Sequence, residues 1–202
     1  MAQAGIASAN VTDEQFAVRD MVRSWAAASK SIDAVRAVEF IRTVDDVDGT
    51  AIAVTGASQG GGISLAVAAL AEGVRAVMPD VPFLCDFPRS SQVAMKNPYL
   101  EIVRYLAVHR DHEEAAFATL AYFDGAVLAR RASAPALFSV ALMDETCPPS
   151  TVYAAYNAYA GAKEIVAYPY NDHEGGAAFH KVRQAAWLAD AMTAPAGLSP
   201  HG

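Results

Sequence analysis

The chain has 202 residues, enough for one domain of ordinary size, and 53% of them are apolar while 18% are charged. This composition supplies a packed core and excludes intrinsic disorder. Fifteen basic against 22 acidic side chains give a formal net charge of −7, and no basic run is present, so no nucleic-acid partner is expected. The N-terminal residues lack a basic leader and an apolar h-region, and no later stretch reaches the roughly 18 apolar residues of a membrane span. We therefore expect no membrane association and a cytoplasmic location.

Along the chain, helical patterns alternate with short apolar runs in the way that is typical of a parallel α/β sheet. Apolar residues at helical spacing predict helices over residues 12–25 and 31–41. Four apolar runs bounded by turn residues predict strands at 51–55, 75–81, 136–142 and 164–168. We expect a small-residue helix from the first strand to about 72, a last helix over about 176–192 and a tail over about 193–202. The pattern predicts one domain, residues 1–202, with about four mostly parallel strands flanked by helices.

The segment between the second and third predicted strands is unusually long. Helical spacing recurs within it at residues 101–109 and 112–122. We expect a helical insertion at about 85–125, which could form a cap over a site or an interface.

Two cysteines, Cys85 and Cys147, are present in the whole sequence. Their number and spacing predict neither a disulfide scaffold nor a zinc site. We expect both to be small buried side chains, and we expect no metal.

The residues Gly56, Ala57, Ser58, Gln59 and Gly60 match the GxSxG pattern of a nucleophile elbow. In that turn the serine hydroxyl is raised above a sheet between a strand and a helix, which is the context predicted here. One alternative is a glycine-rich turn in which the serine only caps the helix. A phosphate-binding turn is not supported, because no Lys-Ser/Thr pair follows and a leucine occupies the position of the last glycine in GxGxxG.

A serine nucleophile needs a base, usually a histidine, and the chain has five histidines. His173 alone follows a predicted strand, in a loop at the edge where open parallel sheets gather their catalytic groups. His109 and His112 lie in a highly charged stretch, where a solvated face is expected. His180 is expected on the surface of the last helix, and His201 lies in the tail.

The same rule indicates Asp144 as the acid that orients the base, because it comes just after the third predicted strand. Asp80 and Asp124 remain open as turn or cap residues. Asp172, next to the predicted base, is badly placed to reach the ring of its own neighbour. The serine, the acid and the base then follow one another in the chain order of α/β-hydrolases.

Several longer stretches carry a distinctive pattern: residues 55–62, 80–87, 122–125, 135–144, 147–152 and 168–176. Together they resemble the acetyl xylan esterase / cephalosporin-C deacetylase family, carbohydrate esterase family 7, and the resemblance extends over roughly residues 33–188. It implies an α/β-hydrolase fold and a serine esterase without cofactor, which removes acetyl groups from small acetylated sugars and cephalosporin-type esters. It also implies a homo-oligomer, since family members commonly form hexamers or other oligomers. By this resemblance Ser58 is the nucleophile, Asp144 the acid, His173 the base and the Gln59 backbone N–H an oxyanion donor.

The sequence also departs from the family. Ala57 replaces a usual glycine, Val127 stands where an asparagine is usual, and the family's N-terminal half, with its RGQ motif and second oxyanion donor, has no counterpart. We therefore expect a sheet shortened at the N-terminus, with strand 51–55 at its edge unless residues 1–45 or another chain cover it. We also expect association through that edge and slow turnover. Two alternatives stay open: a peptidase or thioesterase of the same fold, and a catalytically weak fragment with a structural or oligomer-forming role.

Overall fold

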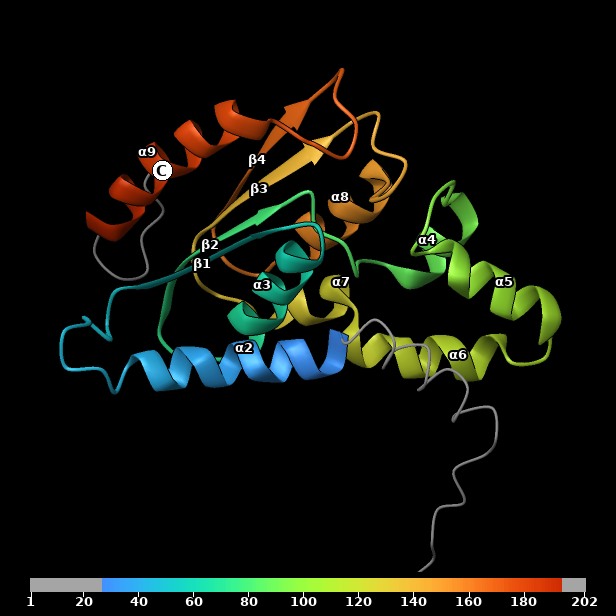
Figure 1. Cartoon of the computed structure of the whole chain (residues 1–202), viewed down its shortest axis with the longest axis horizontal. Helices are drawn as coiled ribbons and strands as arrows, with labels where there is room; N and C mark the ends of the chain where they lie inside the picture. The colour runs from blue at the N-terminus through green and yellow to red at the C-terminus, as the bar shows by residue number, and fades with distance from the viewer. Residues whose placement is uncertain (1–26, 194–202) are drawn as a thin grey trace, which may run out of the picture.

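The computed structural model describes residues 27–193, and its strands form one parallel sheet (Figure 1). The spatial order is the chain order, β1 (Ile52–Ala57), β2 (Val74–Asp80), β3 (Ala136–Ala141) and β4 (Lys163–Tyr168). All four predicted strands are confirmed, with ends shifted by at most two residues, as is usual for element boundaries. Because every crossover steps in the same direction and crossovers are right-handed, the helices that connect the strands lie on the same face.

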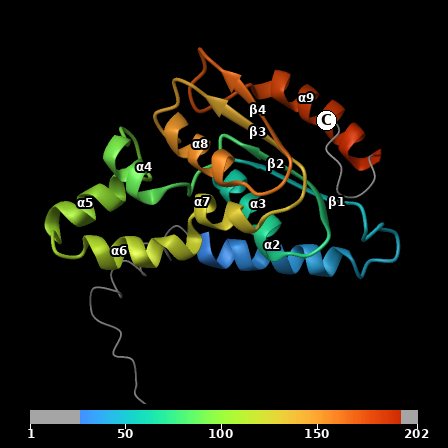
Figure 2. The same ribbon diagram turned by 180° about the vertical axis from the view of Figure 1, so that it is seen from behind.

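Helices cover both faces of the sheet (Figures 1 and 2). The connecting helices α3 (Gln59–Leu70), α7 (Gly125–Leu128) and α8 (Pro149–Ala158) lie on one face, and α9 (Ala177–Thr193) lies on the other. Helix α2 (Ala27–Ile41) packs against α3 and corresponds to the helix predicted at 31–41. The helix predicted at 12–25 and the tail after Thr193 lie outside the described residues. Within residues 27–193, no helix has the length and apolar character that crossing a membrane requires.

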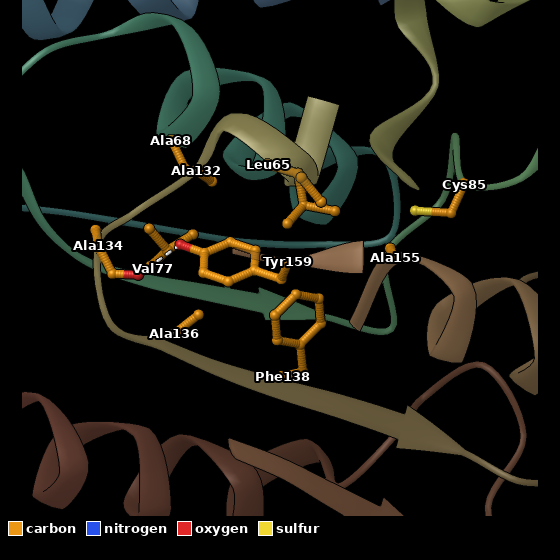
Figure 3. Packing of buried hydrophobic residues seen from close by; sticks show 11 residues of the cluster. Leu65, Ala68, Val77, Cys85, Ala132, Ala134, Ala136, Phe138, Ala155 and Tyr159 are labelled. Carbon is orange, nitrogen blue, oxygen red and sulfur yellow. Dashed lines mark hydrogen bonds between the residues drawn. The ribbon is translucent and has the colours of Figure 1, made fainter. Parts of the chain in front are cut away.

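The core follows the two-residue alternation of side chains along β2 and β3. Val77 and Phe138 face α3 and α8, where they pack with Leu65 and Tyr159 (Figure 3). The Tyr159 hydroxyl lies in this apolar layer and donates to the Ala134 carbonyl at 2.7 Å, which satisfies its polar end. On the opposite face, two α9 side chains pack against alternate strand residues, the whole cluster being Trp187, Ala191, Ala76, Met78 and Leu137.

The insertion between β2 and β3 is helical, as predicted. It contains α4 (Phe87–Val93), α5 (Leu100–Val108), α6 (Glu113–Leu120), η1 (Ala121–Phe123), α7 and η2 (Ala129–Arg131), and its first three helices project beyond the sheet (Figure 1). These helices enclose a buried cluster that includes Phe83, Phe87, Tyr99, Ile102 and Leu120. Asp124 caps α7 and also accepts from the Asp86 and Phe87 backbone N–H groups, so its role as a cap is confirmed.

Candidate active site

Ser58 lies in a sharp turn between β1 and α3. Its backbone has φ 53° and ψ −117°, a positive-φ conformation that costs free energy in a residue with a side chain. The Ser58 N–H donates to the Asp80 carbonyl at 2.9 Å, and the Ser58 carbonyl accepts from the Phe83 N–H at 2.9 Å. These bonds to the end of β2 and to the loop that follows it hold the strained turn in place.

Glycines make the turn possible by letting backbone segments approach closely. A Cβ at Gly56 would lie 2.4 Å from the carbonyl carbon of Gly60, and one at Gly62 would lie 2.2 Å from the Phe83 carbonyl oxygen. At Gly60 itself, a Cβ would meet no atom within 4 Å. Of the two glycines in the GxSxG pattern, only the first is therefore required by sterics.

Three side chains from three loops form a hydrogen-bonded chain at the carboxyl edge of the sheet. His173 Nε2 lies 2.9 Å from Ser58 Oγ, and His173 Nδ1 lies 2.8 Å from Asp144 Oδ2. A carboxylate only accepts, so Nδ1 carries the proton and Nε2 is left to accept from the Ser58 hydroxyl. The structure thus brings together the three residues that the sequence predicted, within the distance that such a chain needs.

The acid is buried and fully engaged. The Asp144 side chain has no exposed surface, whereas 32% of the His173 side chain is exposed. Asp144 Oδ1 accepts from the backbone N–H groups of Thr146 and Cys147, both at 2.8 Å, which leaves Oδ2 for the histidine. The hydrogen bond with Asp144 raises the pKa of His173 above its ordinary 6.5, although partial burial opposes this effect.

The acid and base loops run side by side. The Leu142 N–H donates to the Tyr168 carbonyl at 2.9 Å, and the Met143 N–H donates to the Asn171 carbonyl at 3.1 Å. Asp172 turns away from the neighbouring ring, since its Oδ2 lies 3.0 Å from Lys96 Nζ. The expectation that Asp172 does not serve as the acid agrees with this geometry.

Cys147 is buried, as predicted, but it lies inside the site. Its sulfur, a ring nitrogen of His173 and a carboxylate oxygen of Asp144 lie within 4.8 Å of one another, the spacing of a possible metal site. Burial, and to a lesser extent the charge of Asp144, raise the pKa of the Cys147 thiol, although a hydrogen bond with Ser58 opposes the shift. A metal needs the thiolate, and the imidazole and the carboxylate already bind one another, so this donor set does not fit a metal well.

His180 is completely buried, so its predicted surface position is wrong. Helix α9 packs this residue against the end of the sheet, where His180 Nδ1 lies 3.0 Å from the Tyr168 hydroxyl and Nε2 lies 3.8 Å from Asp80 Oδ1. Burial lowers the pKa of His180, although the charge of Asp80 opposes this effect. Asp80 also accepts from the Ser139 hydroxyl, which in turn accepts from the backbone N–H that follows Asp80. Asp80 is thus part of a buried polar group beneath the loops of the site.

The remaining described histidines lie away from the hydrogen-bonded chain. His109 and His112 are partly buried and stack on one another, with ring centroids 4.9 Å apart, between α5 and α6. The expectation that both histidines lie on a solvated face is therefore correct only in part, because each side chain is partly buried. His201 lies outside the described residues.

A small pocket opens beside the serine. Its volume is about 180 Å³, and its lining residues are Ser58, Gln59, Phe83 and Pro98. Gln59 is the first residue of α3, so its backbone N–H lies at the positive end of a helix of 12 residues. Pro98 comes from the insertion, which therefore contributes one wall of this pocket.

Comparison with known proteins places the chain in a family. The family model described as acetyl xylan esterase (AXE1) matches residues 27–191. This chain belongs to the acetyl xylan esterase family. Acetyl esterase Axe7A of Xylanibacter ruminicola is 31% identical to it over 140 residues, which are 69% of this chain and 31% of that protein.

Solved structures of acetyl xylan esterases show the same fold. The enzyme from Paenibacillus sp. R4 matches with a TM-score of 0.75 and 40% identity, over 79% of this chain and 51% of that one. The enzyme from Thermoanaerobacterium sp. JW/SL YS485 gives a TM-score of 0.74 and 36% identity, over 81% of this chain and 52% of that one. The predicted α/β-hydrolase-like fold and the predicted family are thus confirmed. The chain spans about half the length of these structures and about a third of the curated relative.

Proposed function

We propose that this member of the acetyl xylan esterase family hydrolyses acetyl esters with Ser58 as the nucleophile. The observation that carries the proposal is the continuous hydrogen-bonded chain from Ser58 Oγ through His173 to the buried Asp144. Ser58 lies on a strained strand-to-helix turn, which in this fold exposes the serine hydroxyl above the sheet. Family membership supports the same reaction.

The geometry gives each residue a role in the reaction. His173 Nε2 takes the hydroxyl proton while Ser58 Oγ attacks the acetyl carbonyl carbon. Asp144 holds the ring and stabilises the imidazolium that forms, and the Gln59 backbone N–H donates to the oxyanion of the tetrahedral intermediate. His173 then gives its proton to the departing alcohol, and a water molecule repeats the sequence to release acetate and free the serine. The proposed mechanism uses no cofactor.

The proposed substrates are small acetylated sugars and cephalosporin-type esters. Both carry an acetyl group on an alcohol, so the acyl half of the substrate is the same. The pocket of about 180 Å³ next to Ser58 supports a small acyl group. Turnover that falls steeply from acetyl to butyryl to octanoyl esters of p-nitrophenol would support this. Equal or rising turnover would favour a thioesterase, and hydrolysis of peptide amides would favour a peptidase.

The test of the nucleophile is labelling with a fluorophosphonate probe, which modifies only an activated serine. We expect the chain to be labelled, and the labelling to disappear in Ser58→Ala. Ser150→Ala is the matched control, because Ser150 is also partly exposed and its hydroxyl accepts from Arg89 Nε, not from a histidine. Labelling that survives in Ser58→Ala, or that requires another serine, would contradict the assignment.

A second candidate function is a structural or oligomer-forming role with weak catalysis. The fact that favours it is that the chain spans about half of the relatives' structures. Among residues 27–193, Gln59 is the one oxyanion donor that we assign, and loss of one such donor costs roughly 10²–10³ in kcat. Steady-state hydrolysis of p-nitrophenyl acetate beside a full-length relative separates the two functions. A kcat within tenfold of that of the relative would exclude the second candidate function, the structural role with weak catalysis.

A further inference from the structure

A cluster of charged residues joins the acid loop, the base loop and the helical insertion. Lys96 lies between α4 and α5, and its Nζ is 3.0 Å from Asp172 Oδ2 and 3.2 Å from Glu145 Oε2. Asp172 directly precedes His173, and Glu145 directly follows Asp144. The Glu145 backbone N–H also donates to Asp172 Oδ1 at 3.3 Å. One ammonium group therefore binds the immediate neighbours of both the acid and the base.

The positive charge of Lys96 and the negative charges of Asp172 and Glu145 stabilise one another. Hydrogen bonds with Asp172 and Glu145 raise the pKa of Lys96, and the hydrogen bond with Lys96 lowers the pKa of Asp172. Lys96 and Asp172 are therefore both charged at neutral pH. About half of each side chain is exposed, so each pair alone contributes little, but two carboxylates share one ammonium in a network.

The cluster lies on the outer part of the two loops, next to the bond between the acid and the base. The backbone bonds from Leu142 and Met143 to the base loop join the roots of the loops, close to the sheet. Farther out, Asp144 and His173 meet through a single 2.8 Å bond. Even a small movement of one loop relative to the other would lengthen that bond. Misplacement of a catalytic group by about 1 Å can lower the rate on the order of 10²-fold.

We propose that Lys96 is a positioning residue, whose ammonium holds the acid and base loops in the arrangement that keeps Asp144 bonded to His173. The inference rests on the function proposed above, because it concerns the same site. Lys96 is also two residues from Pro98, which lines the pocket beside Ser58. The same ion pairs therefore fix one wall of the pocket relative to the base.

The test compares Lys96→Met with the unmodified chain in the hydrolysis of p-nitrophenyl acetate, an uncharged substrate. At about 0.01 M salt, where the Debye length is about 30 Å, we expect kcat of the variant to be about two- to tenfold lower. At about 1 M salt, where the Debye length is about 3 Å, kcat of the unmodified chain should fall towards that of the variant. The variant itself should respond little to salt, and Lys96→Arg should retain most of the activity and the salt response.

Lys163→Met is the matched control, because the Lys163 amine donates to the backbone carbonyls of Asn157 and Tyr159, outside the site. It should keep the kcat and the salt response of the unmodified chain. Amide hydrogen exchange gives a readout that does not depend on activity. Lys96→Met should exchange faster than Lys163→Met across residues 142–148 and 169–176, with Glu145 among the accelerated amides.

The outcomes separate this inference from the proposed function. If the unmodified chain is active and Lys96→Met matches it in kcat, salt response and exchange, the positioning role is wrong. If the unmodified chain neither hydrolyses the ester nor reacts with the fluorophosphonate, the proposed function is wrong. In that case, amide exchange in the two loops of Lys96→Met still tests Lys96. Exchange equal to that of the unmodified chain refutes its positioning role, and faster exchange supports Lys96 as a link between the loops.

Discussion

The His173 ring lies between the Asp144 carboxylate, which accepts a hydrogen bond throughout the proposed reaction, and the Ser58 hydroxyl, which must lose its proton. The buried Asp144 fixes the tautomer, and its hydrogen bond raises the pKa of the ring. Asp172 and Asp80 contribute smaller effects in the same direction. The raised pKa has a direct consequence for catalysis, because the ring can act as a base only when it is neutral.

We expect kcat/KM for p-nitrophenyl acetate to fall as the pH drops through a value above 6.5, the ordinary pKa of histidine. In Asp144→Asn the principal cause of the raised pKa is gone, so the acid limb of the profile should move to lower pH. The asparagine amide also favours the wrong tautomer, so kcat should drop by roughly 10⁴. The measurement is the pH profile of both chains. Asp190→Asn, on an exposed part of α9, should leave the profile unchanged, and an unmoved acid limb in Asp144→Asn would contradict the role of Asp144.

In the turn between β1 and α3, the two glycines of the GxSxG motif differ in whether the backbone leaves room for a side chain. Gly56 is required because the backbone of Gly60 lies where its Cβ would be. At Gly60 the space is open, and the residue lies within the first turn of α3. The close approach at Gly62 to the Phe83 carbonyl is as tight as that at Gly56, although Gly62 is outside the motif.

Gly56→Ala should therefore destabilise the fold by about 2–4 kcal/mol and abolish labelling of Ser58, because backbone atoms cannot move aside cheaply. Gly60→Ala should be tolerated and should stabilise α3 by up to about 1 kcal/mol, since alanine favours the helix more than glycine does. Thermal unfolding of the two variants, with fluorophosphonate labelling at room temperature, tests both expectations. Equal destabilisation by the two substitutions would show that the space at Gly60 is not open.

The sheet has an open side at β1. Within residues 27–193, β1 pairs with β2 and with no other strand, so the predicted edge position is confirmed for this part of the chain. Next to it lies a groove of about 380 Å³ between α2 and α3, whose lining includes Val38, Val54, Ile63 and Val67. The outer edge of such a strand presents backbone N–H and C=O groups without a partner strand, and beside apolar side chains it tends to recruit another chain.

We expect the chain to associate with itself through this edge, so that its mass in sedimentation experiments rises with concentration. Thr55→Lys should shift the equilibrium towards the monomer, because Thr55 is exposed on β1 and a charged side chain on an edge strand opposes pairing. Ala178→Lys, at an exposed position of α9, adds the same charge elsewhere and should leave the mass unchanged. A monomer at every concentration would contradict association through β1.

Local features of the sequence were sufficient to predict the strands and the three residues of the hydrogen-bonded chain. Strands that are buried on both faces appear as short apolar runs, which positions 76–80 and 136–141 show clearly. Parallel strands end at the same edge, so polar residues just after their ends, Ser58, Asp144 and His173, could be grouped without knowing any contact. The helical insertion was predictable for the same reason, because helical spacing is a local pattern.

Other features depended on which surfaces pack together, and only the tertiary structure decided them. His180 is buried because α9 lies on the sheet with that residue towards Asp80, and the sequence of a helix does not state which neighbour each of its sides will meet. Lys96 meets Asp172 across 76 positions of the chain, and an exposed lysine in a loop carries no signal of its partner. Cys147 was recognised as a buried residue but not as a neighbour of the serine. Composition and spacing report burial and periodicity, whereas the pairing of distant polar groups is determined only when the core fixes the loops in space.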